Sequence, residues 1–326
     1  MSDELLMKRR TNKLINWQTN KPFQVQVCFF LLVIPAIVSA QSVSFINTPS
    51  DARTGAIGNA GYALSGNSFV THHNSASVFF SDYQNSVAVS YMSWHPNAGN
   101  HSQVNAGAYW TGEKAGIALG YKHNAIPDIE KYDENGNSLG SFTPKENAID
   151  LGIAIRVSEK FAVSSDIRYI GSDMGAETKG SAIAFNINSI YSANNLNLAF
   201  GVTNIGSKIN YGYDKYDLPS VVKVGAAYQH VFEKHCFTFS GEVDYQLKPT
   251  AYSGLAGGLG IEYLLNNTLA LRAGYHASDQ SKTGPSYGSL GAGVNFAGLN
   301  LNAAYWLTGS DNPANKSFLI SLAFNF

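Results

Sequence analysis

The stretch Ile149-Asp-Leu-Gly-Ile-Ala-Ile-Arg156 has an apolar side chain at every second position and a small or polar one between. Successive side chains of a β-strand point to opposite faces of the sheet, so such a strand has one apolar and one polar face. The same alternation recurs from residue 87 onward, for example at Phe161–Tyr169, Phe237–Tyr245 and Leu269–Tyr275. The chain is therefore predicted to be an all-β protein.

Alternation alone fits both a soluble sandwich, with an apolar core, and a transmembrane barrel, whose apolar face meets lipid. The connections between strands separate the two. The expected strands are 87–94, 103–111, 115–123, 148–156, 161–170, 181–191, 196–203, 220–230, 236–245, 254–263, 269–276, 287–296, 300–307 and 318–326. Long connections alternate strictly with short turns, as in bacterial outer-membrane barrels. We therefore predict a 14-stranded antiparallel transmembrane β-barrel over residues 87–326, surrounded by outer-membrane lipid.

Composition and the C-terminus agree with a barrel. Charged residues make up 14% of the chain, whereas a soluble domain has about a quarter. One face of the last strand carries Phe318, Ile320, Leu322, Phe324 and Phe326, and the final aromatic, Phe326, is expected to be the signal for barrel assembly. The chain has 22 basic and 23 acidic residues. Without a basic excess to neutralise phosphates, nucleic acid is not an expected partner.

Residues 1–40 are expected to be a signal peptide that directs Sec-dependent export. A basic beginning precedes the apolar run 25–38, which is too short and too interrupted to be a good membrane span. Cleavage is predicted between Ala40 and Gln41. A lipoprotein signal at Cys28 is disfavoured, because the apolar run continues past this cysteine.

Residues 41–86 do not alternate well and are rich in glycine and other small residues. A barrel of fourteen strands has a lumen too wide for wall side chains alone to fill. This segment is therefore predicted to be a hatch inside the lumen, and a periplasmic tail is the alternative. The residues expected to fold inside and seal the lumen are Asp51, Arg53, Gly55, Gly58 and Gly61, since glycine lets backbone pass close to the wall and turn with φ > 0.

Ten charged residues are expected to face the lumen by the alternation. They are Lys122, Asp150, Arg156, Asp166, Arg168, Lys223, Glu242, Asp244, Glu262 and Arg272. Equal numbers of each sign give no strong field for steering a charged solute. Next to a hatch these groups are expected to pair with one another and with backbone groups. The lumen is thus predicted to be closed and cross-linked.

The chain also matches a known family in five stretches. These are Ser44–Gly61, Glu134–Pro144, Asn204–Ile209, Leu218–Tyr228 and Asn312–Phe326. Together they resemble the PorV/PorQ outer-membrane proteins of Bacteroidota, which are similar to the FadL fold. That family's hatch usually carries Asn-Pro-Ala, where this chain has Asn74-Ser75-Ala76. The resemblance implies a FadL-like barrel with an internal hatch that works in type IX secretion. The implied partners are other components of that system and cargo with a C-terminal sorting domain.

Two functions are compatible with these features: relay of sorting-domain cargo to the cell surface, and FadL-like uptake of hydrophobic molecules. Neither an enzymatic activity nor a cofactor or metal site is expected. The Gly-x-Ser-x-Gly pattern around Ser286 lies where a loop enters a strand, whereas a nucleophile elbow needs a strand, a turn and a helix. His72 and His73 are adjacent, and adjacent residues seldom bind one ion. Residues 133–144 lack the glycine and the closing glutamate of a calcium loop.

Overall fold

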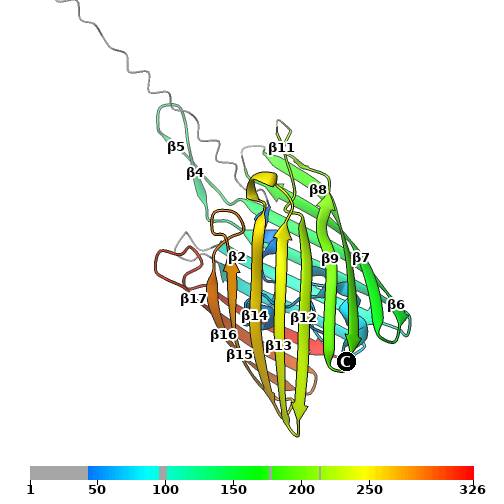
Figure 1. Ribbon diagram of the computed structural model, residues 1–326. Helices are drawn as coiled ribbons and strands as arrows, with labels where there is room; N and C mark the ends of the chain where they lie inside the picture. Colours follow the sequence, from blue (N-terminus) through cyan, green and yellow to red (C-terminus); the bar gives the residue numbers. More distant parts are fainter. Residues whose placement is uncertain (1–42, 95–100, 176–177, 213) are drawn as a thin grey trace, which may run out of the picture. The chain divides into compact units, whose positions relative to one another are not determined.

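The structure is a computed structural model that describes residues 43–94, 101–175, 178–212 and 214–326. Within these ranges fourteen antiparallel strands form a closed barrel (Figure 1). The strands are β1 (Asn85–Trp94), β2 (His101–Thr111), β3 (Ala115–Ala125), β6 (Lys145–Ser158), β7 (Phe161–Asp173), β8 (Lys179–Ala193), β9 (Leu196–Gly206), β12 (Val221–Phe232), β13 (His235–Gln246), β14 (Gly254–Leu265), β15 (Leu269–Ser278), β16 (Tyr287–Phe296), β17 (Leu299–Leu307) and β18 (Phe318–Asn325). The pairing of β1 with β18 closes the barrel, so the predicted 14-stranded architecture is confirmed.

Most strands are longer than expected from the alternation. Strand β6, for instance, begins at Lys145 because Lys145, Glu146 and Asn147 pair with both β3 and β7 although all three are polar. The long connections contain additional short elements: a hairpin of β4 (Ile129–Tyr132) and β5 (Ser138–Phe142), the two-residue strands β10 (Ile209–Asn210) and β11 (Lys215–Tyr216), and the 3₁₀ helix η6 (Thr250–Tyr252). These elements are too short for a periodic pattern to reveal. The predicted signal peptide and its cleavage site, Ala40 and Gln41, lie outside the described residues.

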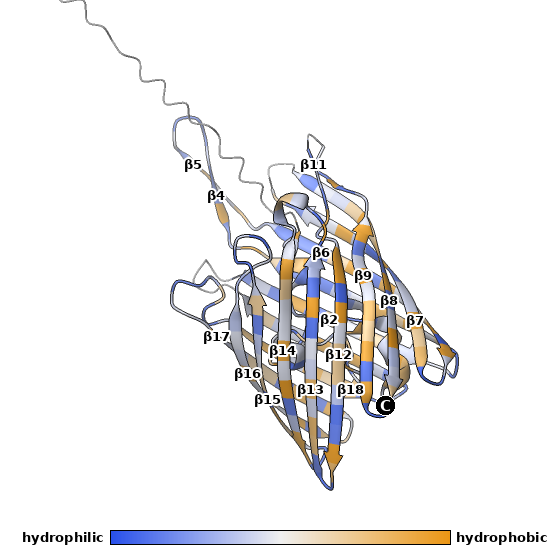
Figure 2. Ribbon diagram, in the orientation of Figure 1, coloured by the Kyte–Doolittle hydropathy of each residue, from blue (hydrophilic) through white to orange (hydrophobic). Residues whose placement is uncertain are grey.

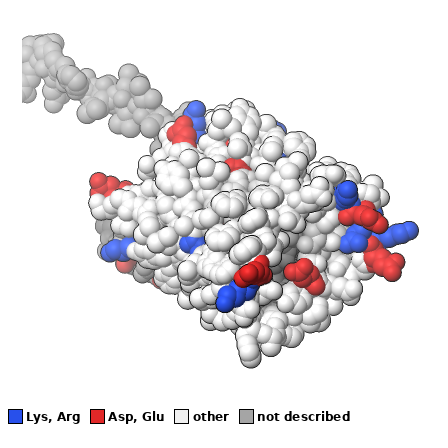
Figure 3. All heavy atoms as spheres, turned by 60° about the horizontal axis from the view of Figure 1, so that its bottom comes forward, with Lys and Arg blue, Asp and Glu red and all other residues white. Residues whose placement is uncertain are grey.

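Large apolar side chains point outward from the barrel. In β6, Ile149 and Ile153 are 55% and 56% exposed, whereas Asp150 between them is completely buried. The same alternation continues along the other strands (Figure 2), and charged side chains stand in small groups between broad uncharged areas of the surface (Figure 3). An exposed apolar band around a polar interior is the arrangement that a lipid bilayer stabilises.

The two ends of the barrel differ in their connections. At the loop end the strands are joined by the long connections, and the β4–β5 hairpin extends beyond the barrel there (Figure 1). At the turn end the connections have two or three residues. Asn194 and Asn195 both have positive φ, of 50° and 65°, as a two-residue type I′ turn requires.

Residues 43–84 are called the N-terminal segment below; residues 43–81 pack against the inner face of the barrel wall, and residues 82–84 are exposed. They contain four short helices: η2 (Ser44–Asn47), α2 (Ala52–Gly55), η3 (Val70–His72) and η4 (Ser75–Phe80). Phe45 packs with Ile170 near the loop end, while the carbonyl of Tyr83 accepts a hydrogen bond from Tyr109 at the turn end. The segment therefore runs the length of the barrel. The helices of the described ranges fall short of the length and apolar character that a membrane crossing needs.

The barrel closes next to its C-terminus. Phe326 and Asn85 exchange two backbone hydrogen bonds, of 2.9 and 3.0 Å. The ring of Phe326 is 53% exposed and stacks on Phe324, with 5.4 Å between the ring centroids. Phe326 thus takes part in the contact between β1 and the end of β18, called the seam below, and also in the outward-facing apolar surface.

Replacing Phe326 with Asp, or deleting it, is expected to leave little folded barrel in the outer membrane. A carboxylate at the lipid boundary is unfavourable, and the seam loses its terminal aromatic. Immunoblots of membrane fractions, with and without heating, measure the folded barrel. Phe326→Tyr keeps the ring and should assemble normally; a normal amount of folded Phe326→Asp would contradict the role of this residue.

Candidate functional site

The inner wall of the barrel is made of glycine where the N-terminal segment turns. A Cβ atom added to Gly258, Gly260 or Gly274 would lie 2.1, 2.4 and 2.2 Å, respectively, from the nearest atom of Ile57 or Gly58. No side chain fits in these places, so the segment rests directly on the backbone of β14 and β15. These wall glycines were not predicted, although they follow the same inward alternation as Glu262 and Arg272.

The glycines of the segment itself serve different needs. Gly58 has a φ of +66°, and its Cα approaches the wall so closely that a Cβ would lie 2.4 Å from the carbonyl oxygen of Tyr275. Gly55 and Gly61 provide space: added Cβ atoms would lie 3.2 Å from Leu319 and 2.3 Å from Thr54. Only Gly58 of the three combines a left-handed conformation with contact to the wall.

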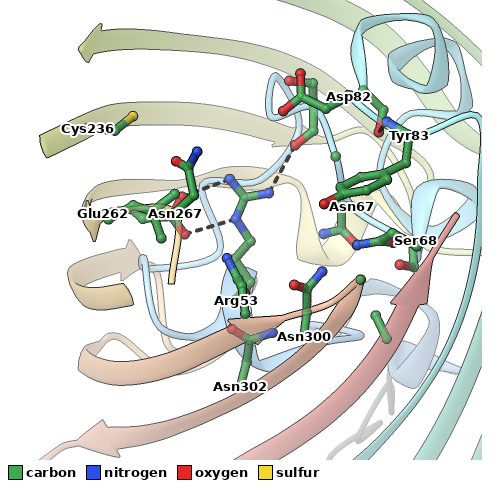
Figure 4. Close-up of a pocket in the computed structure, with 18 of the residues that line it drawn as sticks. Arg53, Asn67, Ser68, Asp82, Tyr83, Cys236, Glu262, Asn267, Asn300 and Asn302 are labelled. Carbon is green, nitrogen blue, oxygen red and sulfur yellow. Dashed lines mark hydrogen bonds and ion pairs between the residues drawn. The ribbon is translucent and has the colours of Figure 1, made fainter. Parts of the chain in front are cut away.

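Arg53 connects the segment to two strands of the wall (Figure 4). Its Nη2 and Nε atoms donate to the carboxylate of Glu262 in β14, at 2.8 and 3.0 Å. The same carboxylate accepts a hydrogen bond from Arg272 in β15, which also donates to Asn302 in β17. A single buried carboxylate is therefore shared by two guanidinium groups, one from the segment and one from the wall.

Asp51 is bound within the segment. Its carboxylate caps α2 by accepting a hydrogen bond from the Thr54 amide at 3.0 Å. It also lies 2.9 Å from His73 Nε2 and accepts a hydrogen bond from Asn67 at 3.1 Å. Asp51 thus joins three parts of the segment that are distant in sequence.

The barrel charges near the loop end contact the segment and one another. Lys122 Nζ, which is buried, donates to the carbonyl oxygen of Thr48 at 2.8 Å. Asp150 pairs with Arg168, and His72 Nδ1 lies 3.2 Å from the same carboxylate, without the alignment of a hydrogen bond. Arg168 also donates to Asn204 at 2.7 Å. Segment and wall therefore form one polar network here.

The stretch Asn74-Ser75-Ala76 forms the start of η4. The Asn74 side chain accepts a hydrogen bond from the Ala76 amide at 3.0 Å and donates to the carbonyl oxygen of Ser189 at 3.1 Å. The Ser75 hydroxyl donates to Asp166 in β7. A proline at this position, as is usual in the resembling family, has no hydroxyl with which to bind Asp166.

The remaining predicted lumen charges form two further groups. Lys223 Nζ donates to Glu242 and Asp244 at 2.7 and 2.8 Å, and Glu242 accepts a hydrogen bond from the Tyr62 amide at 2.9 Å. Arg156 donates to the carbonyl oxygen of Phe79 at 2.7 Å. All ten charged residues therefore have partners in the segment or the wall. Some of these partners are uncharged polar side chains or backbone groups.

The two larger cavities in the described part of the barrel have no lining residue in common. The turn-end cavity, of about 680 Å³, is polar and contains the Arg53–Glu262 pair (Figure 4). Its asparagines are Asn67, Asn266, Asn267, Asn295, Asn300, Asn302 and Asn325. The loop-end cavity, of about 370 Å³, has an aromatic wall that includes Tyr287 and Trp306. The N-terminal segment contributes residues to both cavities.

The other motifs singled out in the sequence, at Ser286 and Asp133, make local hydrogen bonds. The Ser286 hydroxyl accepts a hydrogen bond from the Ser278 amide and donates to the Ser278 carbonyl oxygen. Asp133 accepts hydrogen bonds from the side chain and backbone of Asn137, and these lower the pKa of the Asp133 carboxyl group. Across residues 43–94, 101–175, 178–212 and 214–326, no group of three or more His, Cys, Asp or Glu side chains is arranged to hold a metal ion.

Comparison with known families decides the identity of this barrel. Residues 36–253, more than half of the chain, match the family described as type IX secretion system protein PorV. The chain belongs to the PorV family. Its resemblance to PorV/PorQ proteins is thereby confirmed, and the family and the barrel fold together place the protein in the outer membrane. A comparison with curated protein sequences gives no significant match.

Solved structures with the same fold are FadL-like barrels. The Pseudomonas putida toluene transporter TodX is 12% identical, with a TM-score of 0.55 over 83% of this chain and 98% of that one. The CymD monoaromatic hydrocarbon channel is 12% identical, with a TM-score of 0.57 over 85% and 97%. A Pseudomonas aeruginosa FadL homologue is 11% identical, with a TM-score of 0.55 over 86% and 99%. At these identities the likeness shows the fold of this PorV-family chain and nothing about its ligand.

Proposed function

We propose that this PorV-family protein is a non-enzymatic component of type IX secretion that receives sorting-domain cargo and relays it to the cell surface. The observation that carries this proposal is the match to the PorV family over residues 36–253. In the proposed orientation the loop end faces the outside of the cell, as in other outer-membrane barrels. The loops and rim, rather than a channel through the barrel, would then contact the cargo.

The proposal includes a hatch formed by the N-terminal segment. Arg53, Lys122 and Ser75 each lie in a bond between this segment and the wall, and wall glycines accommodate its backbone. An ion pair that crosses from segment to wall opposes movement of the segment, because separation leaves a buried charge without a partner. We therefore infer a lumen that is closed at rest.

The exposed β4–β5 hairpin is a candidate contact for a protein partner. Ile129, Tyr132 and Leu139 are exposed on it, and Lys131 lies 4.8 Å from the ring centroid of Phe142. Aromatic and apolar side chains of this kind are common anchors of protein interfaces. The hairpin would thus offer cargo a surface that does not require the lumen to open.

The alternative is FadL-like transport of hydrophobic small molecules. The fold it shares with TodX and CymD and the aromatic wall of the loop-end cavity favour this alternative. A hydrophobic molecule that passes through the lumen would have to break the hydrogen bonds and ion pairs around Arg168 and Lys223, because these groups lie in the lumen. The cargo relay requires no such rearrangement.

Purification of the tagged protein from native outer membranes tests the two functions. In the relay, proteins with C-terminal sorting domains co-purify and are lost from a variant that lacks the hairpin residues 129–142. In transport, extracted lipids contain fatty acids or other hydrophobic molecules in stoichiometric amounts, and no sorting-domain protein co-purifies. The latter result would reject the relay.

A further inference from the structure

The N-terminal segment fills only one side of the barrel at the turn end. On that side Val78 and Phe79 of η4 pack with inward alanines of the wall, such as Ala118 in β3 and Ala154 in β6. On the other side, next to β13–β18, the turn-end cavity of about 680 Å³ remains. Side-chain amides line the cavity where alanines line the filled side. The two sides of the wall are thus built for different occupants.

Three asparagines form a row along the cavity, called the amide row below. Asn267 lies in the turn between β14 and β15, Asn295 in β16, and Asn300 in β17 directly opposite Asn295. Asn267 is exposed, and the other two are partly exposed. Within the described residues, the side-chain amides of this row make no hydrogen bond. Asparagine is unfavourable in β-strands, so Asn295 and Asn300 indicate a purpose other than the stability of the sheet.

Arg53 adds open donors to the same cavity, where Figure 4 shows it together with Asn267 and Asn300. Its Nε and Nη2 atoms donate to Glu262, and its Nη1 atom donates to the carbonyl oxygen of Ser65 at 2.9 Å. A guanidinium group has five N–H bonds, so two of them remain without a partner. The Arg53 side chain is 21% exposed. A ligand in the cavity can therefore reach donors of Arg53 as well as the amide row.

The charges around the cavity narrow the class of ligand. Its interior is lined by equal numbers of positive and negative side chains: Arg53, Arg272, Asp51 and Glu262. Asp82 lies at the exposed rim. The interior thus has no net formal charge with which to attract an ion. A hydrocarbon would leave the amides and the open guanidinium donors without water or a partner. The ligand that fits is neutral and offers both donors and acceptors.

The spacing of the amide row favours an extended chain. Neighbouring strands are about 4.8 Å apart, so the row from Asn267 to Asn300 spans about 10 Å. An extended peptide covers this distance with about three residues, and it offers N–H and C=O groups in equal numbers. A side-chain amide matches both groups, and a carbonyl oxygen suits the charged donors of Arg53. A sugar chain has no comparable series of carbonyl oxygens.

We propose that the turn-end cavity binds a short, uncharged and extended segment of another protein. Asn267, Asn295 and Asn300 pair with successive peptide groups of this segment, and Arg53 donates to one of its carbonyl oxygens. In the proposed orientation the turn end faces the periplasm, so the partner is a periplasmic protein. The site is separate from the loop end, to which the cargo relay is assigned, and peptide binding does not depend on that relay.

Isothermal titration calorimetry with the whole purified protein in lipid nanodiscs tests the proposal. The probes are two N-acetylated, C-amidated octapeptides, one of alternating serine and threonine and one of alternating alanine and glutamine. At least one is expected to bind saturably with a Kd of about 1 mM or tighter. The same peptide with every backbone nitrogen methylated should bind about tenfold more weakly or worse, because its N–H donors are lost.

Variants of the amide row locate the binding. Asn300→Leu should weaken it about tenfold or more, since a peptide group then loses its partner. Asn300→Gln keeps the amide and should retain binding. Asn135→Leu makes the same chemical change in the exposed turn between β4 and β5 and should have no effect. If Asn300→Leu does not fold, Asn295→Leu takes its place with the same expected loss.

Competing outcomes overturn the proposal. A tetramer of N-acetylglucosamine represents a neutral sugar chain, and its binding in place of both peptides would make the site a glycan site. The proposal also fails if neither peptide saturates below about 10 mM, if the methylated peptide binds like its parent, or if the leucine variants of the amide row bind like wild type. Each of these results leaves the cargo relay to its own test, the co-purification of sorting-domain proteins.

Discussion

Deletion of residues 43–76 is expected to convert a barrel that does not conduct into a steadily open pore. The deletion removes α2, η3 and the backbone that rests on Gly258 and Gly274. The fourteen strands should still insert, since β1 pairs with β18 without any contribution from these residues. Conductance of the purified protein in planar lipid bilayers measures the effect.

The matched control for this deletion lies outside the lumen. Removing residues 133–137 deletes the whole exposed turn between β4 and β5 and should leave the barrel closed. The hatch would be refuted by a wild-type protein that conducts steadily, with no change when residues 43–76 are removed. In that case the segment would not seal the barrel.

The second large effect is expected from Glu262→Ala. This change removes the carboxylate that Arg53 and Arg272 share, and it leaves two guanidinium groups without that counter-charge in the interior. Loss of one partner from a buried ion pair typically lowers stability by about 3–5 kcal/mol. We expect a lower free energy of unfolding in guanidinium chloride, measured in lipid vesicles, together with transient opening events in planar bilayers.

An exposed ion pair provides the comparison for Glu262→Ala. Asp173 and Lys179 lie 3.1 Å apart, with side chains that are 46% and 72% exposed, and exposed pairs contribute about 0–1 kcal/mol. Asp173→Ala should therefore change neither stability nor conductance measurably. Equal effects of the two substitutions would mean that the Arg53–Glu262 contact does not hold the segment.

The sequence allowed the barrel to be predicted because lipid demands an apolar side chain at every second position of every strand. The inward charges followed from the same rule, as Asp150 and Glu262 show. Their partners could not be predicted, since ten charges on a curved wall allow many pairings and the choice depends on how the segment folds. The same holds for Asp51 of the segment, whose partners are His73, Thr54 and Asn67 of the segment itself; no periodicity brings these residues together.

One feature left a signal in the sequence that was open to interpretation. Gly258, Gly260 and Glu262 lie at every second position of one strand, and a row of glycines on the inward face indicates that something is packed closely against it. The aromatic wall of the loop-end cavity gave no comparable signal. His276, Tyr287 and Trp306 come from three strands, and only the register between these strands stacks their rings.

The direction of the N-terminal segment has a consequence for how the barrel is made. The described chain starts at Val43 near the loop end, crosses the interior and enters β1 at the turn end. If β1 and β18 joined first, the segment would have to be threaded afterwards through a finished cylinder and placed against wall glycines that leave no space for a side chain. Assembly is simpler in the opposite order, with the strands wrapping around a segment already folded between them. The segment would then be enclosed as the last seam closes, while the pairing of β1 with β18 itself needs none of its residues.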